Sequence, residues 1–177
     1  MNHVRAYACA AGIFLLAGAA IAYSYYDAHA EIAIDQTAYY PVTHVMDGDT
    51  FEASIGKREI TVRLLGVDTP ETVDPRKQVQ CFGKDASDET KSLLTGHSVQ
   101  LKLNPDREEK DKYGRYLAYV YVDTGTFLNE FLVSNGYARE YTFGSAYSFQ
   151  KQFQEDQSQA QKEGKGLWTA CPQGTFK

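Results

Sequence analysis

Apolar and polar residues alternate along five stretches of the chain, and this pattern predicts five β-strands. Turns rich in glycine separate the first three stretches, so these strands are expected to form a meander. The first turn contains Asp47-Gly48-Asp49, and the second contains Gly56-Lys57. The predicted strands span residues 38–45, 51–55, 59–67, 99–103 and 115–122.

Elsewhere, apolar residues recur at helical spacing, which predicts helices over residues 82–96, 126–135 and 145–162. In the second helix Thr126 is the expected N-cap, and Gly136 marks the end. Three strands, a helix, two strands and two helices follow one another, which is typical of an OB-type barrel. We therefore predict an α+β, mainly β fold: a five-stranded antiparallel OB-fold barrel with three helices.

The first thirty residues differ in kind from the rest. Arg5 precedes an uncharged apolar run over residues 6–22, and a polar stretch then ends in Ala28-His29-Ala30. This order is typical of an export signal with a cleavage site near Ala30. The run is also close to the length of a membrane span, so an uncleaved membrane anchor is the alternative. We predict a signal or anchor over 1–30 and one domain over 31–177, secreted, periplasmic or anchored to the membrane outside the cytoplasm.

The cysteines agree with export. Cys9 lies in the apolar leader, so Cys81 and Cys171 are the thiols of the mature domain. In an oxidising compartment these two are expected to form a disulfide, and two separate buried thiols are the alternative.

Charge argues against a simple electrostatic nucleic-acid binder. The chain has 18 Lys and Arg against 23 Asp and Glu, a formal net charge of −5. Nucleic-acid-binding domains usually carry a basic surface, so sequence-independent affinity for nucleic acid should be weak.

Paired functional groups gather in three segments. Two carboxylates, Asp68 and Glu71, follow Arg63 where a predicted strand ends. Oxygen ligands beside a guanidinium suit a hard metal ion and a phosphate. The other two segments are Asp47-Gly48-Asp49-Thr50 and Asp111-Lys-Tyr-Gly-Arg115. Taken alone, each segment is also explained as a turn or a charged loop.

Together and in this order, the segments resemble the staphylococcal (micrococcal) nuclease family, over roughly residues 39–168. The motifs that carry the resemblance are VMDGDTF, RLLGVDTPET, FGKDAS, DKYGRYLAYVYV and KEGKGLW. The resemblance implies an OB-fold barrel and a Ca²⁺-dependent endonuclease. Such an enzyme cleaves the phosphodiester bonds of DNA and RNA and leaves 3′-phosphate ends.

The resemblance also implies roles for particular residues. Asp49 and Asp68 would be the carboxylate ligands of Ca²⁺, and Thr69 would add its backbone carbonyl. Glu71 would hold or deprotonate the attacking water. Two catalytic arginines would clamp the phosphate, since a guanidinium donates two hydrogen bonds to one phosphate. These are Arg63 and Arg115.

Substrate contacts are implied for the turn that contains Lys112 and Tyr113. Tyr141 is our choice for a second aromatic contact, although a shift of one or two residues would move that role. DNA and RNA are the expected partners, a membrane is a partner only if the leader is uncleaved, and we expect a monomer.

One geometric question stays open in the sequence. Arg63 and Asp68 are an odd number of residues apart, so an unbroken strand would place them on opposite faces. Gly66 could bend or end the strand between them.

Two other functions compete with a nuclease. A catalytically silent OB-fold module that binds nucleic acid or protein would not need the complete set of implied catalytic groups. A surface adhesin with a structural Ca²⁺ is disfavoured, because Arg63, Arg115 and Lys112 would repel the cation.

Overall fold

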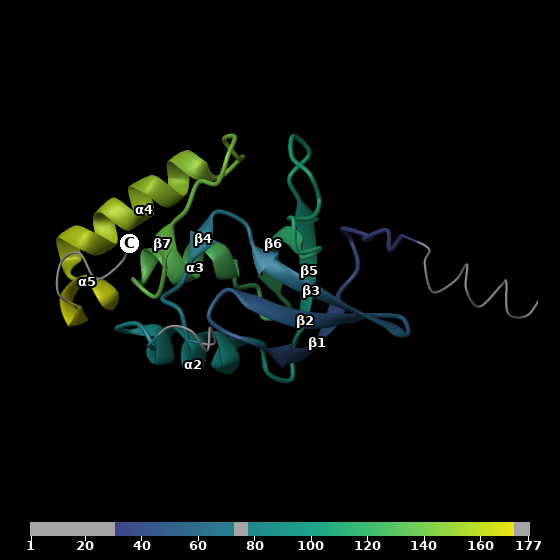
Figure 1. Cartoon of the computed structure of the whole chain (residues 1–177), viewed down its shortest axis with the longest axis horizontal. Coiled ribbons are helices and arrows are strands. Elements are labelled where there is room, and N and C mark those ends of the chain that lie inside the picture. The colour runs from purple at the N-terminus through teal and green to yellow at the C-terminus, as the bar shows by residue number, and fades with distance from the viewer. Residues whose placement is uncertain (1–30, 73–77, 172–177) are drawn as a thin grey trace, which may run out of the picture. The chain divides into compact units, whose positions relative to one another are not determined.

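The inward-facing side chains of five strands meet in the interior of a closed barrel. The computed structural model of the protein describes residues 31–72 and 78–171. The strands of the barrel follow one another around it in the order β1-β2-β3-β6-β5. They are β1 (Tyr40–Val45), β2 (Thr50–Ile55), β3 (Arg58–Leu64), β5 (Ser98–Leu103) and β6 (Tyr116–Val122). The predicted OB-type barrel is therefore confirmed (Figure 1).

The barrel is mixed rather than purely antiparallel, which corrects the predicted topology. β3 and β6 pair in parallel, with Val62 opposite Tyr116 and Leu64 opposite Ala118. Strand directions cannot alternate all the way around a closed ring with an odd number of strands. A five-stranded barrel must therefore contain at least one parallel pair, and β3–β6 is that pair here.

The predicted alternation places apolar residues inside the barrel. Along β3 buried and partly exposed residues alternate, and Ile60, Val62 and Leu64 point inward. In β1 the register shifts between Val42 and His44, which is a β-bulge that bends the strand. Fully or almost fully buried side chains form the core: Phe51, Ala53, Val62, Leu64, Val99, Leu101, Ala118 and Val120.

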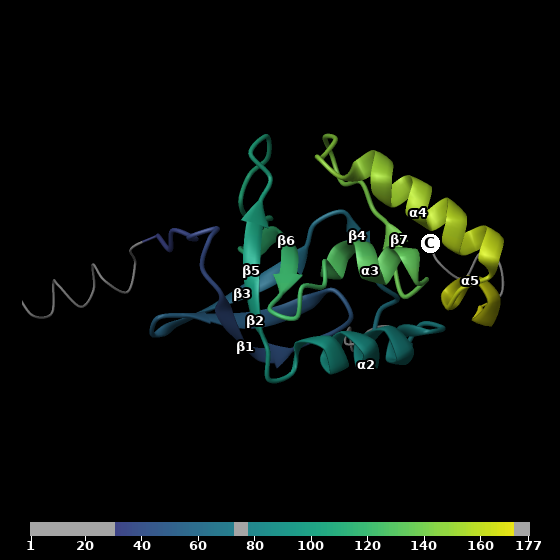
Figure 2. The ribbon, with the colours of Figure 1, turned by 180° about the vertical axis from the view of Figure 1, so that it is seen from behind.

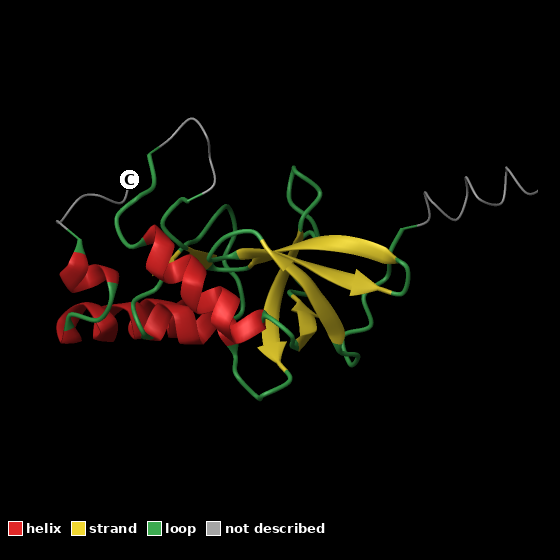
Figure 3. Ribbon diagram, turned by 90° about the horizontal axis from the view of Figure 1, so that it is seen from below, coloured by secondary structure: helices red, strands yellow, loops and turns green. Residues whose placement is uncertain are grey.

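The helices gather at one end of the barrel (Figures 2 and 3). They are α2 (Gly83–Leu94), α3 (Leu128–Ser134), α4 (Gln150–Glu163) and the short α5 (Leu167–Ala170). α2 contacts β1, while α3 packs against both β6 and α4. Within the described ranges, no helix has the length and apolarity that a membrane crossing requires. The predicted signal or anchor over residues 1–30 lies outside the described residues.

Some predicted boundaries were wrong. α3 begins after Phe127 and not after Thr126, whose side chain makes no cap to the helix. α4 begins at Gln150, five residues later than the pattern suggested. The predicted strand over 59–67 is divided into β3 and a separate strand, β4 (Val67–Asp68), which pairs with β7 (Arg139–Glu140).

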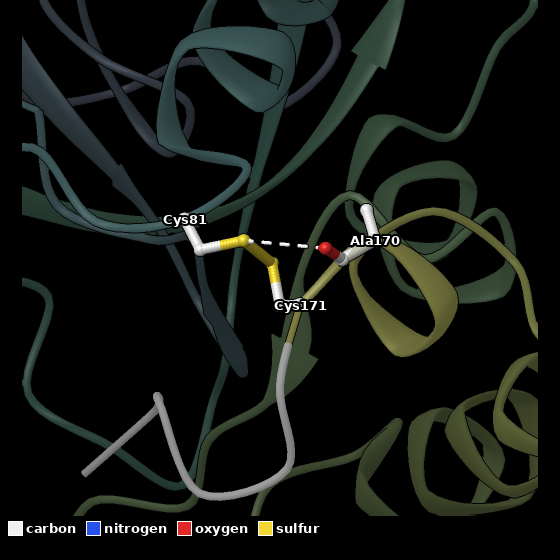
Figure 4. The surroundings of a disulfide bond; sticks show 3 residues. All are labelled: Cys81, Ala170 and Cys171. Carbon is white, nitrogen blue, oxygen red and sulfur yellow. Dashed lines mark hydrogen bonds between the residues drawn. A yellow bond between two sulfur atoms is a disulfide. The ribbon is translucent and has the colours of Figure 1, made fainter.

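The predicted disulfide is present. Cys81 and Cys171 are joined with a Cα–Cα distance of 5.8 Å (Figure 4). The bond links the segment before α2 to the residue after α5 and closes a loop of 90 residues. In the chain-entropy treatment a loop of this size stabilises the fold by about 4–5 kcal/mol.

A buried asparagine joins α3 to the barrel. Asn129 is 0% exposed, and its Nδ2 donates to the carbonyl oxygens of Leu65 (2.9 Å) and Ala118 (3.2 Å). Its Oδ1 accepts from the backbone N–H of Val120 at 2.9 Å. Since Leu65 directly follows β3, this side chain fixes the end of that strand against β6.

Asn129→Ala should therefore destabilise the fold by about 2–4 kcal/mol, because it leaves buried backbone groups without partners. Urea denaturation followed by circular dichroism measures the change. Asn135→Ala is the matched control: Asn135 Nδ2 donates to the Phe131 carbonyl oxygen at 2.9 Å in a partly buried position, and its loss should cost less than about 1 kcal/mol. Equal costs for the two variants would contradict the role given to Asn129.

Candidate anion and metal site

A glycine turn at the end of β3 builds the centre of the site. Gly66 has φ +77°, a conformation that residues with a Cβ rarely adopt. The turn ends β3 at Leu64 and starts β4 at Val67, so the chain does not continue as one flat strand. Arg63 Nη1 reaches back to the Val67 carbonyl oxygen at 2.7 Å. Arg63 and Asp68 thus meet despite their odd spacing, which answers the question that the sequence left open.

Arg63 lies between two carboxylates. Its Nη1 is 2.9 Å from Asp49 Oδ2, and its Nη2 is 3.2 Å from Asp68 Oδ1. The Arg63 side chain is only 13% exposed, so solvent screens these contacts weakly. The structure therefore brings together three of the predicted site residues, one from the β1–β2 turn, one from β3 and one from β4.

Asp49 is held by several donors. Its Oδ2 accepts from the backbone N–H of Thr69 (2.8 Å) and from Thr69 Oγ1 (3.0 Å), and its Oδ1 accepts from Thr50 Oγ1 (3.0 Å). The turn itself is fixed from α2, where Thr90 Oγ1 donates to the Gly48 carbonyl oxygen at 2.8 Å. Asp49 is 5% exposed, and these donors orient its buried carboxyl group.

A second acid in the same turn has a perturbed pKa. Burial raises the pKa of Asp47 to about 7, and the neighbouring Asp49 carboxylate adds to this rise. The raised pKa favours the neutral form of Asp47, and a cation bound at this turn would favour its charged form.

Arg139 is a site residue that sequence reasoning missed. It stands opposite Asp68 in the β4–β7 pair, and its Nε (2.9 Å) and Nη2 (2.7 Å) both donate to Asp68 Oδ2. Each oxygen of Asp68 thus contacts a different arginine. β7 has only two residues, too few to produce an alternating pattern, so no sequence signal indicated this partner.

Arg115 is paired with an acid on its own loop. Its Nε and Nη2 lie 2.8 Å and 2.7 Å from Asp111 Oδ2, and its guanidinium lies 5.4 Å from the centre of the Tyr113 ring. Burial alone would raise the pKa of Asp111, but hydrogen bonds from Arg115 and from the Tyr113 backbone outweigh it and lower the pKa. Asp111 thus fixes the loop that presents Arg115.

A cavity of about 730 Å³ connects the two arginines. Arg63 and Arg115 line it together with Lys112, Tyr113 and Tyr141, so five predicted residues share one pocket. The exposed aromatic rings stand at its rim: Tyr113 is 71% exposed, Tyr141 42% and Phe143 67%. Asp49, Asp68, Thr69 and Glu71 do not line this cavity, and Arg63 connects it to the first two of them.

Glu71 lies beyond β4 on the loop that leads to α2. Its backbone N–H donates to Gln80 Oε1 at 2.9 Å, and its carbonyl oxygen accepts from the Gln80 N–H at 2.9 Å. Its Oε1 accepts from the backbone N–H of Thr72 at 2.9 Å. Both the backbone and the carboxylate of Glu71 are thus held by hydrogen bonds, and Gln80 makes the two to the backbone.

The donor set fits a hard cation. Asp49 and Asp68 offer carboxylate oxygens to the two ends of one guanidinium, so the pair already surrounds a positive charge. Oxygen donors of this kind suit Ca²⁺ or Mg²⁺ rather than a thiophilic metal. Within residues 31–72 and 78–171, no group of three or more His, Cys, Asp or Glu is arranged to hold a metal. A cation here would therefore need backbone oxygens and water as further ligands.

Fold and site together define an OB-type barrel protein in which arginines line a cavity beside clustered carboxylates. Residues 61–170 match the family described as "Staphylococcal nuclease homologue". A protein named "Thermonuclease" from Staphylococcus hyicus is 44% identical over 130 residues, which cover 73% of this chain and 75% of that protein. Its namesake from Staphylococcus intermedius is 43% identical over 129 residues, with 73% and 75% covered.

A more distant relative is "Endonuclease YncB" from Bacillus subtilis (strain 168), 39% identical over 125 residues, which cover 70% of this chain and 58% of that protein. The family match covers more than half of this chain, and the two thermonucleases match over 73% of it. The chain belongs to the staphylococcal nuclease family.

Gly66→Ala should destabilise the fold by about 2–4 kcal/mol, through a strained positive φ and a steric clash. A Cβ at this position would lie 2.6 Å from the Tyr147 ring. Gly125→Ala is the matched control, since Gly125 has φ +93° and nothing within 4 Å of a Cβ. Urea denaturation of both variants separates the clash from the backbone strain, and equal losses of stability would mean that the contact with Tyr147 has no effect.

Proposed function

We propose that this protein is an exported Ca²⁺-dependent endonuclease that hydrolyses phosphodiester bonds of DNA and RNA and leaves 3′-phosphate ends. Membership of the nuclease family supports the reaction class. The contact of Arg63 with both Asp49 and Asp68, in the wall of the cavity that also contains Arg115, is the observation that carries the proposal.

Each arginine would exchange a carboxylate for a phosphate. Arg63 now pairs with Asp49 and Asp68, and Arg115 pairs with Asp111. A scissile phosphate in the cavity would take both guanidinium groups, and a cation would take the place of Arg63 beside the two carboxylates. If Arg63 turned to the phosphate without a cation, the buried Asp49 would lose its guanidinium partner and Asp68 would keep only Arg139. Cation and substrate should therefore strengthen each other's binding.

The chain's own residues supply the rest of the chemistry. Glu71 would accept a proton from the attacking water or hold that water in line with the phosphorus. The water oxygen would then bond to phosphorus, the bond from phosphorus to the 5′ oxygen would break, and that oxygen would take a proton from solvent water. Arg63 and Arg115 would stabilise the charge that grows on the phosphate oxygens. Bound Ca²⁺, held by Asp49, Asp68 and the Thr69 carbonyl, would add positive charge there as a Lewis acid.

The aromatic rim would contact the substrate bases. Tyr113 and Tyr141 are exposed at the cavity and could stack on unpaired bases, while Lys112 would add charge near the sugar–phosphate backbone. The acidic chain gains little general attraction to nucleic acid, so these local contacts and the cation should dominate affinity.

The disulfide supports a location outside the cytoplasm, because such bonds persist in oxidising compartments. We propose a signal or anchor over residues 1–30 and a nuclease domain over 31–177 that acts as a monomer. The barrel starts at Tyr40, before the family match at residue 61, so the domain is longer than the match.

Purified protein should cleave plasmid and single-stranded DNA in the presence of Ca²⁺, and cleavage should stop when a chelator is added. Gel electrophoresis follows the cleavage, and the fragments should accept a 5′ phosphate directly because their 5′ ends carry hydroxyl groups. Cleavage that persists in chelator contradicts the role of the cation. Binding of DNA without cleavage would instead identify a catalytically silent OB-fold module.

Glu71→Gln should lower kcat by about 100-fold or more, because the amide cannot accept a proton from water. Calorimetry should find an almost unchanged Ca²⁺ affinity, since Glu71 is not among the proposed ligands. Glu155→Gln is the matched control: Glu155 is exposed on α4, 3.7 Å from Lys151, and its loss should leave kcat unchanged. Near-normal activity of the Glu71 variant would remove this residue from its role.

A further inference from the structure

The segment around Cys81 touches the backbone of Glu71 in several places. Gln80 binds Glu71 twice, once through its side-chain Oε1 and once through its backbone N–H, both at 2.9 Å. Gly83 packs so closely on the same stretch that a Cβ there would lie 3.1 Å from the carbonyl oxygens of Glu71 and Pro70. Residues 80–83 therefore form a support behind Glu71, and we call them the Glu71 support.

The backbone of this support is held in an uncommon conformation. Phe82, directly after Cys81, has φ +64° and is the only residue other than glycine with a positive φ within the described ranges. A bulky side chain keeps such a conformation only where its surroundings impose it. Phe82 packs on Tyr137, with ring centres 5.8 Å apart, and the disulfide fixes the residue before it.

The other end of the disulfide is anchored in the body of the protein. Cys171 is 8% exposed, and its backbone N–H donates to the Leu167 carbonyl oxygen at 3.1 Å. Leu167 is buried, and its N–H donates to the Gly136 carbonyl oxygen at 2.9 Å. α5 is thus attached to the turn after α3, and the bond carries this attachment to Cys81.

Figure 4 shows how the bond reaches α5. Cys81 Sγ lies 3.7 Å from the carbonyl oxygen of Ala170, the last residue of α5. A disulfide sulfur has no proton to donate, so this is a packing contact and not a hydrogen bond. Without the covalent bond, Cys81 would be held to α5 by weak contacts alone.

We propose that Gln80 is the positioning residue of Glu71 and that the Cys81–Cys171 disulfide holds Gln80 in place, so that full nuclease activity requires the oxidised protein. This inference rests on the proposed role of Glu71. Gln80 fixes the backbone of Glu71, and the backbone determines where its carboxylate can lie. Reduction frees Cys81 from α5, the support loosens, and Glu71 spends less time in its working position.

The redox step is a thiol–disulfide exchange. On oxidation the two cysteine thiols lose two protons and two electrons to a disulfide donor, which becomes a dithiol. Dithiothreitol reverses the step: it gives two thiols at Cys81 and Cys171 and becomes a cyclic disulfide. In a reducing cytoplasm the chain would therefore stay in its weakly active form.

Activity assays test whether Gln80 and the disulfide position Glu71. They are run at a temperature at which every variant is folded. Gln80→Ala, which keeps the disulfide, should lower kcat roughly 10-fold with KM nearly unchanged, since it displaces a catalytic group and not a binding group. Gln80→Glu, which keeps an oxygen acceptor of the same reach, should restore most of the activity. A fully active Gln80→Ala variant would overturn the role of Gln80.

The double variant Cys81→Ser, Cys171→Ser should lower kcat roughly 5-fold and should no longer respond to dithiothreitol. Wild-type protein should fall to the same level when reduced and recover when reoxidised. Combining the double variant with Gln80→Ala should give a loss close to that of Gln80→Ala alone, because both changes act through one support. The coupling between the disulfide and Gln80 would be overturned if the kcat losses of the two changes multiplied in the combined variant. It would also be overturned if the double cysteine variant were less stable than the wild type but equally active.

Hydrogen exchange tests the same coupling without any catalysis. The amide of Glu71 should exchange about 10-fold faster in Gln80→Ala and in reduced wild type than in the oxidised protein. If oxidised protein with Ca²⁺ fails to cleave DNA while exchange responds as expected, the proposed function fails and the mechanical coupling stands. Unchanged exchange on reduction overturns the coupling whatever the activity.

Discussion

The glycine turn at Leu65–Gly66, between β3 and β4, is the constraint on which the site depends. A positive φ at Gly66 ends β3 and sends β4 toward β7, and Arg63 can then reach both the Val67 carbonyl and Asp68. The same turn is held from several sides, since Gly66 oxygen accepts from the Tyr141 N–H at 3.0 Å. Asn129 fixes Leu65 just before it. The positions of Arg63 and Asp68 thus depend first on backbone geometry and only then on charge.

Charge then determines what the site can bind. Arg63 pairs with Asp49 and Asp68, and Arg139 pairs with Asp68 as well. Arg115 pairs with Asp111. Each guanidinium is partly buried and already has an anionic partner, so an incoming phosphate must replace a carboxylate rather than fill a gap. In the proposed mechanism an anion that arrived without a cation would be disfavoured, because the buried Asp49 would lose its guanidinium partner. An acidic protein can in this way bind a polyanion through a few well-placed groups.

Sequence reasoning found most of the fold and much of the site. Alternation located the five barrel strands, and ordered motifs indicated Asp49, Arg63 and Asp68, which the structure brings into contact. It missed the parallel β3–β6 pair, although an odd number of strands in a closed ring demands one. Arg139 escaped because contacts made by a two-residue strand depend on tertiary packing and leave no periodic pattern. The odd spacing of Arg63 and Asp68 suggested opposite faces of one strand, and only the positive φ of Gly66 shows how the two side chains meet.

Glu71 differs physically from Arg63, Asp68 and Asp49. Arg63 and Asp68 lie on strands, where ladder hydrogen bonds fix each residue, and Asp49 lies in a turn clamped by Thr69 and Thr90. Glu71 lies after the end of β4, outside any strand or helix, and Gln80 binds its backbone. A covalent bond next to its contact residue, Gln80, compensates for the missing ladder. The disulfide therefore acts beside a residue that no strand ladder or helix holds.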